Sequence, residues 1–276
     1  MKLSIITINY NNRDGLQKTI DSVVCQTWRD FEWIIIDGGS TDGSREFIEK
    51  HQDKFSYWCS ESDKGVYNAM NKGIAKAQGE WINFMNSGDV FAYPTTLELI
   101  FSKEHTADIL YGYMMRRTLD GMPHNIPSMK PHISWEDFYF DTLPHQSSYI
   151  RRRLFEEYGG YDETYPRLAD WHWFMRICTH HKATLEFIPH KLSVYECGGI
   201  SEDEHWRDDL ARIHREEFPT YMSVNDFLDI RDLHAILDKK WSRFMYKVIR
   251  KLVHKFDEAN RKKEFNRVRF KDNGKI

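Results

Sequence analysis

Short apolar runs alternate with amphipathic segments over the first 113 residues, and few folds are compatible with that alternation. Residues 33–36 read Trp-Ile-Ile-Ile without a polar interruption, as expected of a strand in a sheet that is covered on both faces. Residues 14–26 repeat their apolar side chains with the period of one helical face. The alternation therefore predicts a doubly wound α/β sheet.

The expected elements follow from the same patterns. We expect strands at 3–9, 31–37, 55–60, 80–86 and 107–113, and helices at 14–26, 40–50, 65–78 and 94–104. Further along we expect a hairpin at 114–126, strands at 146–150 and 183–196, and helices at 152–158, 170–180 and 202–217. Composition changes after Phe218-Pro219, so we place one domain at 1–220, with halves at 1–113 and 114–220, and a helical extension at 221–276.

Composition is that of a globular protein. Of 276 residues, 41% are hydrophobic, 14% aromatic and 29% charged. No apolar stretch approaches the ~20 residues that span a bilayer, and the N-terminus lacks a signal-peptide cleavage site. The four cysteines form no C-x-x-C pair and match no zinc spacing. We therefore expect a cytoplasmic protein with reduced thiols.

Positive charge is concentrated at the C-terminus. Residues 239–276 carry a net charge of +10, so the remainder carries −13 of the total of −3. Within 239–256, apolar side chains form a helical stripe, and no acidic residue occurs on the other faces. Such a helix is typical of an interfacial segment on an anionic membrane, although it would also suit packing on the main domain or a partner subunit. The acidic body argues against a nucleic-acid reader.

The stretch 81–89, Trp-Ile-Asn-Phe-Met-Asn-Ser-Gly-Asp, joins a buried strand to an acidic turn. In open α/β sheets, ligands bind outside the carboxyl ends of the strands. Asp89 lies there on a loop kept slim by Ser87 and Gly88, so its carboxylate is well placed to hold a hard cation. One carboxylate together with ligand phosphates is a usual way to bind such an ion. The stretch predicts a nucleotide-diphosphate ligand and a divalent metal, Mn²⁺ or Mg²⁺.

A second acid, Asp37, ends the predicted strand 31–37 beside Gly38 and Gly39. Its carboxylate could accept hydrogen bonds from a ribose or a base, or it could belong to an ordinary turn. The chain has no G-x-G-x-x-G after its first strand and no G-x-x-x-x-G-K-[ST], which disfavours NAD binding and P-loop phosphate transfer. It also has no H-E-x-x-H and no G-x-S-x-G, which argues against zinc hydrolases and α/β-hydrolases.

Five polar motifs occur in a fixed order in the first half. They are Asn9-Tyr10-Asn11-Asn12, Cys25-Gln26-Thr27, Asp37-Gly38-Gly39-Ser40-Thr41-Asp42-Gly43, Ser62-Asp63-Lys64-Gly65-Val66-Tyr67-Asn68-Ala69-Met70-Asn71-Lys72-Gly73 and Asn86-Ser87-Gly88-Asp89. In this order the set resembles the inverting glycosyltransferases of family 2, which have the GT-A fold. Among them it is most similar to bacterial surface-polysaccharide (colanic-acid-type) enzymes, over residues 1–220.

The resemblance implies that residues 1–113 are a nucleotide-binding half. The residues implied in nucleotide binding are Asn9, Tyr10, Asp37, Asp63 and Lys64. Tyr10 would lie near the base, although a tyrosine at this position would also suit the core. Asp89 would be the metal ligand, as the last acid of a D-x-D-type motif. The chain departs from that motif because Asn86 or Ser87 replaces the earlier acid, which leaves one carboxylate.

Residues 114–220 resemble the acceptor and catalytic-base half of the same family. An inverting transfer needs a base, and the resemblance implies Asp170, at the expected start of a helix. An N-cap role is the plainer alternative, but the preceding Gly-Gly-Tyr-Asp-Glu at 159–163 and the aromatic residues that follow favour the base. His145 could touch acceptor or metal, or be an ordinary histidine in a tight loop. A loop with Gly198, Gly199 and Ser201 resembles one that closes over donor phosphates, or is a plain helix entry capped by Ser201.

Together these features predict a metal-assisted, inverting hexosyltransferase. It would move a sugar from a nucleotide-sugar donor, UDP-linked, to a saccharide or lipid-linked acceptor in bacterial surface polysaccharide biosynthesis. We expect it in the cytoplasm, with peripheral binding to the inner face of the plasma membrane through residues 239–256. A sugar nucleotidyltransferase is disfavoured because residues 9–15 are not a Gly-rich basic loop. A non-catalytic carbohydrate- or nucleotide-binding scaffold is the other alternative, and it would tolerate loss of Asp89 or Asp170.

Overall fold

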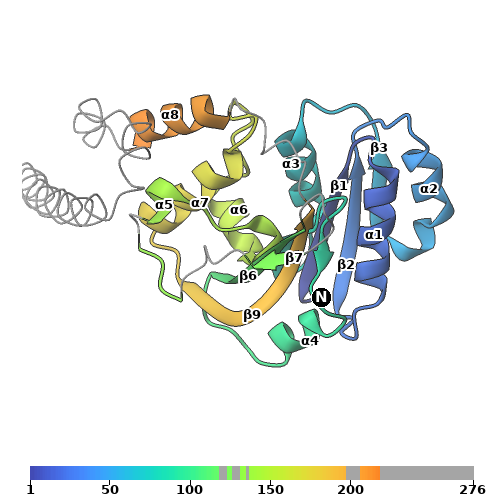
Figure 1. Cartoon of the computed structure of the whole chain (residues 1–276), viewed down its shortest axis with the longest axis horizontal. Helices are drawn as coiled ribbons and strands as arrows, with labels where there is room; N and C mark the ends of the chain where they lie inside the picture. The colour runs from blue at the N-terminus through green and yellow to red at the C-terminus, as the bar shows by residue number, and fades with distance from the viewer. Residues whose placement is uncertain (118–122, 126–130, 135–136, 197–205, 218–276) are drawn as a thin grey trace, which may run out of the picture. The chain divides into compact units, whose positions relative to one another are not determined.

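The computed structural model describes residues 1–117, 123–125, 131–134, 137–196 and 206–217 (Figure 1). The chain divides into two compact units, Met1–Ile213 and His214–Ile276. Of the second unit, only residues 214–217 are described. The expected extension at 221–276, the basic segment at 239–256 and the boundary at 220 therefore lie outside the described residues. None of the described helices is long and apolar enough to cross a membrane.

A mixed sheet runs through the first unit. Its strands are β1 (Leu3–Asn9), β2 (Phe31–Asp37), β3 (Tyr57–Ser60), β4 (Trp81–Phe84), β5 (Val90–Phe91), β6 (Ile109–Arg117), β7 (Pro123–Asn125), β8 (Ser148–Arg151) and β9 (Leu185–Glu196). Their order is β3-β2-β1-β4-β8-β6-β9-β5, and β7 pairs with β6. Strands β1 to β4 are mutually parallel where they pair, and β8 joins β4 in antiparallel orientation. The predicted doubly wound α/β sheet is thus present, and it is mixed because β8 and β5 run against their neighbours.

Helices connect and cover the strands. They are α1 (Arg13–Val24), α2 (Ser44–Lys50), α3 (Val66–Lys76), α4 (Thr96–Phe101), α5 (Asp137–Phe140), α6 (Arg152–Tyr158), α7 (Ala169–Thr179) and α8 (Trp206–Glu217), with 3₁₀ turns η1 (Gln52–Lys54) and η2 (His145–Ser147). The helix expected from residue 40 begins only at Ser44, because Ser40 donates to Asp37 instead of capping the helix. The expected hairpin is formed by β6 and β7, and its Asp-Gly turn lies outside the described residues.

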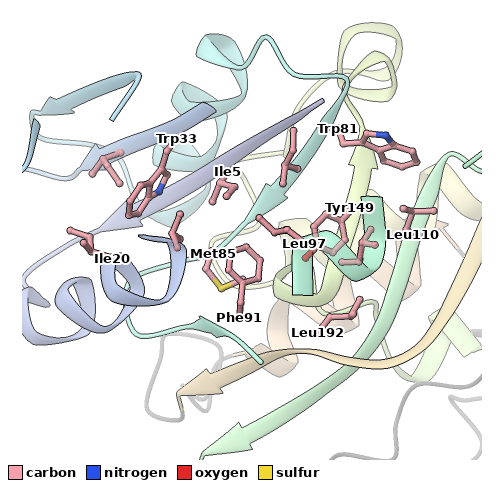
Figure 2. Close-up of a cluster of buried hydrophobic side chains, with 14 of the residues drawn as sticks. Ile5, Ile20, Trp33, Trp81, Met85, Phe91, Leu97, Leu110, Tyr149 and Leu192 are labelled. Carbon is pink, nitrogen blue, oxygen red and sulfur yellow. The ribbon is translucent and has the colours of Figure 1, made fainter. Parts of the chain in front are cut away.

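One face of the sheet packs against α1 and α4. Leu16, Ile20 and Val23 on α1 and Leu97 and Ile100 on α4 are almost completely buried in one cluster. Figure 2 shows the strands' contribution to this cluster, including side chains from β1, β2, β4, β6 and β8. Because successive strand residues point to opposite faces, Leu3 and Ile5 of β1 enter this cluster, while Ile6 faces the other side.

Helix α3 covers the opposite face at very short range. Gly73 makes this approach possible, because a Cβ at that position would overlap Cγ2 of Ile6 on β1. Both residues are buried. The close approach brings the N-terminal half of α3 to the carboxyl edge of the sheet, where β1 and β2 end.

We expect Gly73→Ala to destabilise the protein, although alanine normally favours a helix interior by about 1 kcal/mol. The added methyl group overpacks the contact with Ile6, which should lower the free energy of unfolding by about 1–3 kcal/mol. Denaturant unfolding of Gly73→Ala, Ile6→Ala and the double variant measures this. The double variant should be more stable than the sum of the two losses predicts. Strict additivity would show that the two side chains do not compete for the same space.

Candidate active site

Asp37 holds the ends of three parallel strands together. Its Oδ1 accepts hydrogen bonds from Asn9 Nδ2 at 2.7 Å and Ser40 Oγ at 2.6 Å, and its Oδ2 accepts from Ser60 Oγ at 2.6 Å and the Ser40 backbone N–H at 3.0 Å. Burial of this carboxyl raises its pKa, but the Ser40, Ser60 and Asn9 hydrogen bonds outweigh burial and hold the pKa below its usual value. The carboxylate is fully buried, so its hydrogen-bonding capacity is used by the protein itself.

Tyr10 and Asp63 flank the backbone of Gly38. A Cβ on Gly38 would lie 2.6 Å from Asp63 Oδ2 and 3.2 Å from Tyr10 Cδ2. The Tyr10 side chain is 67% exposed, so it is not the core tyrosine that the sequence also allowed. Asp63 accepts a hydrogen bond from the Gly65 N–H at 2.9 Å, and Lys64 beside it is exposed. The structure therefore brings the predicted nucleotide-binding residues to one edge of the sheet.

The turn that carries Asp89 is fixed from helix α1. Thr19 Oγ1 donates to the Asp89 carbonyl at 2.8 Å and accepts from the Gly88 N–H at 3.0 Å. Asn12 Nδ2 donates to the Ser87 carbonyl at 3.0 Å. Gly88 has φ of +106°, a conformation that disfavours any other residue. Sequence reasoning missed Thr19, whose only signal is a polar residue on the buried face of α1.

Asp89 itself is a buried carboxyl with few donors. Its Oδ1 accepts the Glu196 backbone N–H at 3.2 Å, and only 4% of the residue is exposed. Burial raises the pKa of Asp89 to about 7, against opposing contributions from His145 and from the Glu196 and Gln146 hydrogen bonds. The Glu196 carboxylate forms an ion pair with Lys18, with an N–O distance of 2.6 Å. A nearby positive charge would therefore stabilise the ionised form of Asp89.

Asp170 is the second residue of α7, whose N-cap is Leu168. The N-cap role that the sequence allowed for Asp170 is therefore wrong, because Asp170 already lies inside the helix. Oδ1 accepts from the Tyr67 hydroxyl at 2.7 Å, and Oδ2 contacts His145 Nδ1 at 2.9 Å. Burial raises the pKa of Asp170, but the interactions with His145, Tyr67 and the Trp171 N–H together hold it below the usual value. Asp170 is thus buried yet ionised at neutral pH.

His145 connects Asp170 to the Asp89 turn. Its Nε2 lies 3.2 Å from Asn86 Nδ2, while Nδ1 faces Asp170. Both ring nitrogens are therefore engaged within the protein. Asn83 on β4 fixes the turn that bears His145, because its Nδ2 donates to the Gln146 carbonyl at 3.2 Å and the Ser148 carbonyl at 2.9 Å. Sequence reasoning missed Asn83, although an amide inside an apolar strand was a visible signal.

Helix α3 joins the two predicted halves of the domain. Asn71 Nδ2 donates to the Tyr161 carbonyl and Asn71 Oδ1 accepts the Tyr161 N–H, both at 2.9 Å. Tyr67, one helical turn earlier, reaches Asp170. A Cβ on Gly160 would overlap the Asn71 side chain. Sequence reasoning missed both contacts. The signal that could have indicated them was that Tyr67 and Asn71 are four positions apart and therefore lie on the same face of the helix.

Two expectations stay open at this site. Gly198, Gly199 and Ser201 lie outside the described residues. Within the part of the chain that the structure describes, no group of three or more His, Cys, Asp or Glu side chains could hold a metal ion.

The model of the family described as "Glycosyl transferase family 2" matches residues 4–159. The chain belongs to this family. It is therefore a glycosyltransferase, as its motifs predict. The match covers the nucleotide-side motifs, the Asp89 turn and His145, and it ends just before the loop that leads to Asp170.

Curated relatives of this glycosyltransferase carry the same general name. An "uncharacterized glycosyltransferase" of Mycobacterium tuberculosis is 36% identical over 182 residues, which cover 63% of this chain and 68% of the relative. A "PGL/p-HBAD biosynthesis glycosyltransferase" of Mycobacterium bovis is 28% identical over 250 residues, covering 87% of this chain and 91% of that protein.

Solved structures confirm the GT-A fold. TarS 1–349 of S. aureus, in complex with UDP-GlcNAc, has a TM-score of 0.63 at 20% identity, over 78% of this chain and 66% of that one. The longer TarS chain is matched over 38% of its length. The mannosyltransferase PcManGT of Pyrobaculum calidifontis, in complex with GDP-Man and Mn²⁺, has a TM-score of 0.57 at 17% identity, over 80% of this chain and 64% of that one.

The raised pKa of Asp89 predicts a pH-dependent cost in stability. A carboxyl whose pKa is about 7 when folded and about 3.9 when unfolded stabilises the fold below pH ~4 and loses that contribution as pH rises through 7. Asp89→Asn stays neutral throughout. Its free energy of unfolding relative to wild type should therefore rise between pH ~4 and ~7, by up to about 4 kcal/mol.

Chemical denaturation at a series of pH values measures this difference. Asp14→Asn is the control, because the Asp14 side chain is 89% exposed, and its difference from wild type should not rise in the same way. A flat profile for Asp89→Asn would mean that Asp89 is ionised in the folded protein well below pH 7.

Proposed function

We propose that this glycosyltransferase transfers a sugar from a UDP-sugar to a saccharide or lipid-linked acceptor, with inversion at the anomeric carbon. The observation that carries the proposal is the pair of buried acids joined by one histidine. Asp170 is ionised and reaches His145, and His145 reaches the turn that bears Asp89. A base and a group suited to the leaving diphosphate are thereby held in one connected unit.

Inversion by a single displacement requires a base for the acceptor hydroxyl. The hydroxyl oxygen bonds to the anomeric carbon, the bond from that carbon to the diphosphate oxygen breaks, and the hydroxyl proton passes to Asp170. The lowered pKa of Asp170 supports this role because it keeps the carboxylate ionised before the transfer. Its burial supports it too, since burial limits the access of water to the group that takes the proton.

Nucleotide binding is assigned to the edge where β1 and β2 end. The exposed Tyr10 ring offers a stacking surface for the base, and Asp63 can accept a hydrogen bond from the base or the ribose. Asp37 and Asn9 support Tyr10 and Asp63 indirectly. Asn9 donates a hydrogen bond to Asp37, and this contact fixes the strand ends. The UDP-GlcNAc complex of the TarS relative supports a uridine donor.

A divalent cation suits the Asp89 turn by its chemistry. The buried Asp89 carboxyl has few donors, and the buried Ser87 Oγ has no partner among the described residues. Oxygen ligands of this kind are those that Mg²⁺ and Mn²⁺ prefer. Asp89 would hold the ion, which when bound offsets charge on the departing diphosphate. The Mn²⁺ in the PcManGT complex supports the assignment.

The acceptor is assigned to surface glycolipid or polysaccharide synthesis. The relative named for PGL/p-HBAD biosynthesis supports this class of product. A lipid-linked acceptor also fits the basic amphipathic sequence at 239–256, which we assign to the anionic inner face of the plasma membrane.

Tyr10→Ala should weaken UDP binding, measured by calorimetry, by roughly 5- to 150-fold, since stacking on one base contributes about 1–3 kcal/mol. Tyr10→Phe keeps the ring and should bind UDP nearly as well as wild type. Tyr93→Ala is the matched control, because Tyr93 is also exposed, at 50%, but lies after β5. Equal affinity of Tyr10→Ala and wild type would remove Tyr10 from the nucleotide site.

Asp170→Asn should abolish transfer while UDP binding stays within about twofold of wild type, because general-base catalysis contributes 10²–10⁴-fold to the rate. The assay measures nucleotide release from a panel of nucleotide sugars, with saccharide acceptors and with Mn²⁺ or Mg²⁺. Turnover by Asp170→Asn at the wild-type rate would exclude Asp170 as the base. If wild type turns over no donor in the panel with any acceptor, the transferase proposal itself is wrong.

A further inference from the structure

The two oxygens of Asp170 are not equivalent. Oδ1 accepts the Tyr67 hydroxyl at 2.7 Å and the Trp171 N–H at 2.9 Å. Oδ2 has His145 Nδ1 at 2.9 Å. An ionised carboxylate offers about two lone-pair positions on each oxygen. Oδ1 is therefore filled by these two donors, whereas Oδ2 keeps one position beside the histidine for a further hydrogen.

The partners of His145 define which ring nitrogen carries hydrogen. A carboxylate can only accept, so Nδ1 donates to Asp170. Asn86 Nδ2 lies 3.2 Å from Nε2 and can donate to it when the ring is neutral. Asn86 Oδ1 is buried without a partner among the described residues, and in this orientation of the amide the nitrogen is the atom that faces the imidazole. The imidazole is thus held as the Nδ1–H tautomer between two elements.

Strand β4 and the turn after it hold His145 in place. Asn83 Nδ2 donates to the carbonyl of Gln146, inside the η2 turn, and to that of Ser148, directly after it. Phe84 meets the His145 ring edge-on, with ring centroids 6.5 Å apart. Asn86 completes the contact at Nε2. Three residues of one short segment therefore determine where Nδ1–H points.

We propose that His145 is a positioning residue, which orients Asp170 so that Oδ2 takes the proton of the acceptor hydroxyl. The inference rests on the proposed role of Asp170 as base and adds which atom acts and what fixes it. His145 keeps its own proton throughout: the acceptor O–H bond breaks, its oxygen bonds the anomeric carbon, the bond to the diphosphate oxygen breaks, and the proton goes to Oδ2. Without His145 the carboxylate can rotate, and a misplacement of ~1 Å can cost about 10²-fold in rate.

The chain offers a matched control histidine. His105 Nδ1 contacts the Glu186 carboxylate at 2.9 Å, and the His105 ring meets Trp81 edge-on. Its side chain is fully buried, so His105→Ala removes a buried histidine–carboxylate contact of the same geometry outside the site. His145→Asn is the conservative variant, because the asparagine Nδ2–H can replace the Nδ1–H donor.

The kinetic test measures UDP release from the UDP-sugar that wild type turns over, at saturating and limiting donor. We expect His145→Ala to lower kcat by about 10- to 100-fold with the donor KM and the UDP affinity unchanged. His145→Asn should recover most of the lost rate, and His105→Ala should lower thermal stability but not kcat. His145→Ala in an Asp170→Asn background should cause no further loss, since both changes act on one group.

Three outcomes would overturn the inference. If His145→Asn is as slow as His145→Ala, the imidazole itself takes the proton. If His145→Ala raises KM and leaves kcat unchanged, the residue binds donor instead of positioning the base. If His145→Ala and His105→Ala lower kcat equally, the loss reflects general destabilisation.

A spectroscopic test is independent of turnover. Nitrogen-15 NMR of histidine-labelled wild type should show His145 as the Nδ1–H tautomer, which is the less common one for a free imidazole. An Nε2–H tautomer would overturn the inference even if the enzyme is active. A protein that transfers no sugar but shows the Nδ1–H tautomer would instead contradict the proposed function and leave the His145–Asp170 contact established.

Discussion

Buried carboxylates need hydrogen-bond donors, and this requirement organises the site of the glycosyltransferase. An ionised carboxylate without partners costs several kilocalories per mole in a protein interior. Asp37 draws its donors from the last residues of β1 and β3 and from Ser40 after β2, and it thereby ties the ends of three strands together. Asp170 draws its donors from α3 and η2. The loops of the site are held together by the need to satisfy these two groups.

Asp89 shows the opposite arrangement. It is as buried as the other two acids, but its pKa rises to about 7 because burial outweighs the few donors that reach it. Ionisation of such a carboxyl lowers the stability of the folded protein. A bound cation can offset that loss. The three acids therefore differ in their proposed roles. Asp37 and Asp170 have their hydrogen-bond donors, and they fix the strand ends and accept a proton, respectively. Asp89 has few donors, and it is the group suited to a metal ion.

Helix α3 links these groups across the domain. Gly73 lets it lie against β1, and its N-terminal half carries Tyr67 and Asn71 toward the elements that follow residue 158. Gly73 therefore determines how closely the helix that carries Tyr67 and Asn71 lies against the sheet. The nucleotide side and the base side of the site are joined by this helix as well as by His145.

The sequence by itself determined the α/β alternation, the family, and the positions of Asp37, Asp89 and Asp170 at element ends, because these depend on local periodicity and on ordered motifs. It could not determine that Asp170 lies inside the first turn of α7, or that Asp37 is saturated by protein donors. Nor could it show the contacts of His145 with Asn86 and Asp170, which lie 59 and 25 positions away. Only the tertiary structure decided these pairings, because β4, η2 and α7 meet through sheet order and packing, which no local pattern encodes.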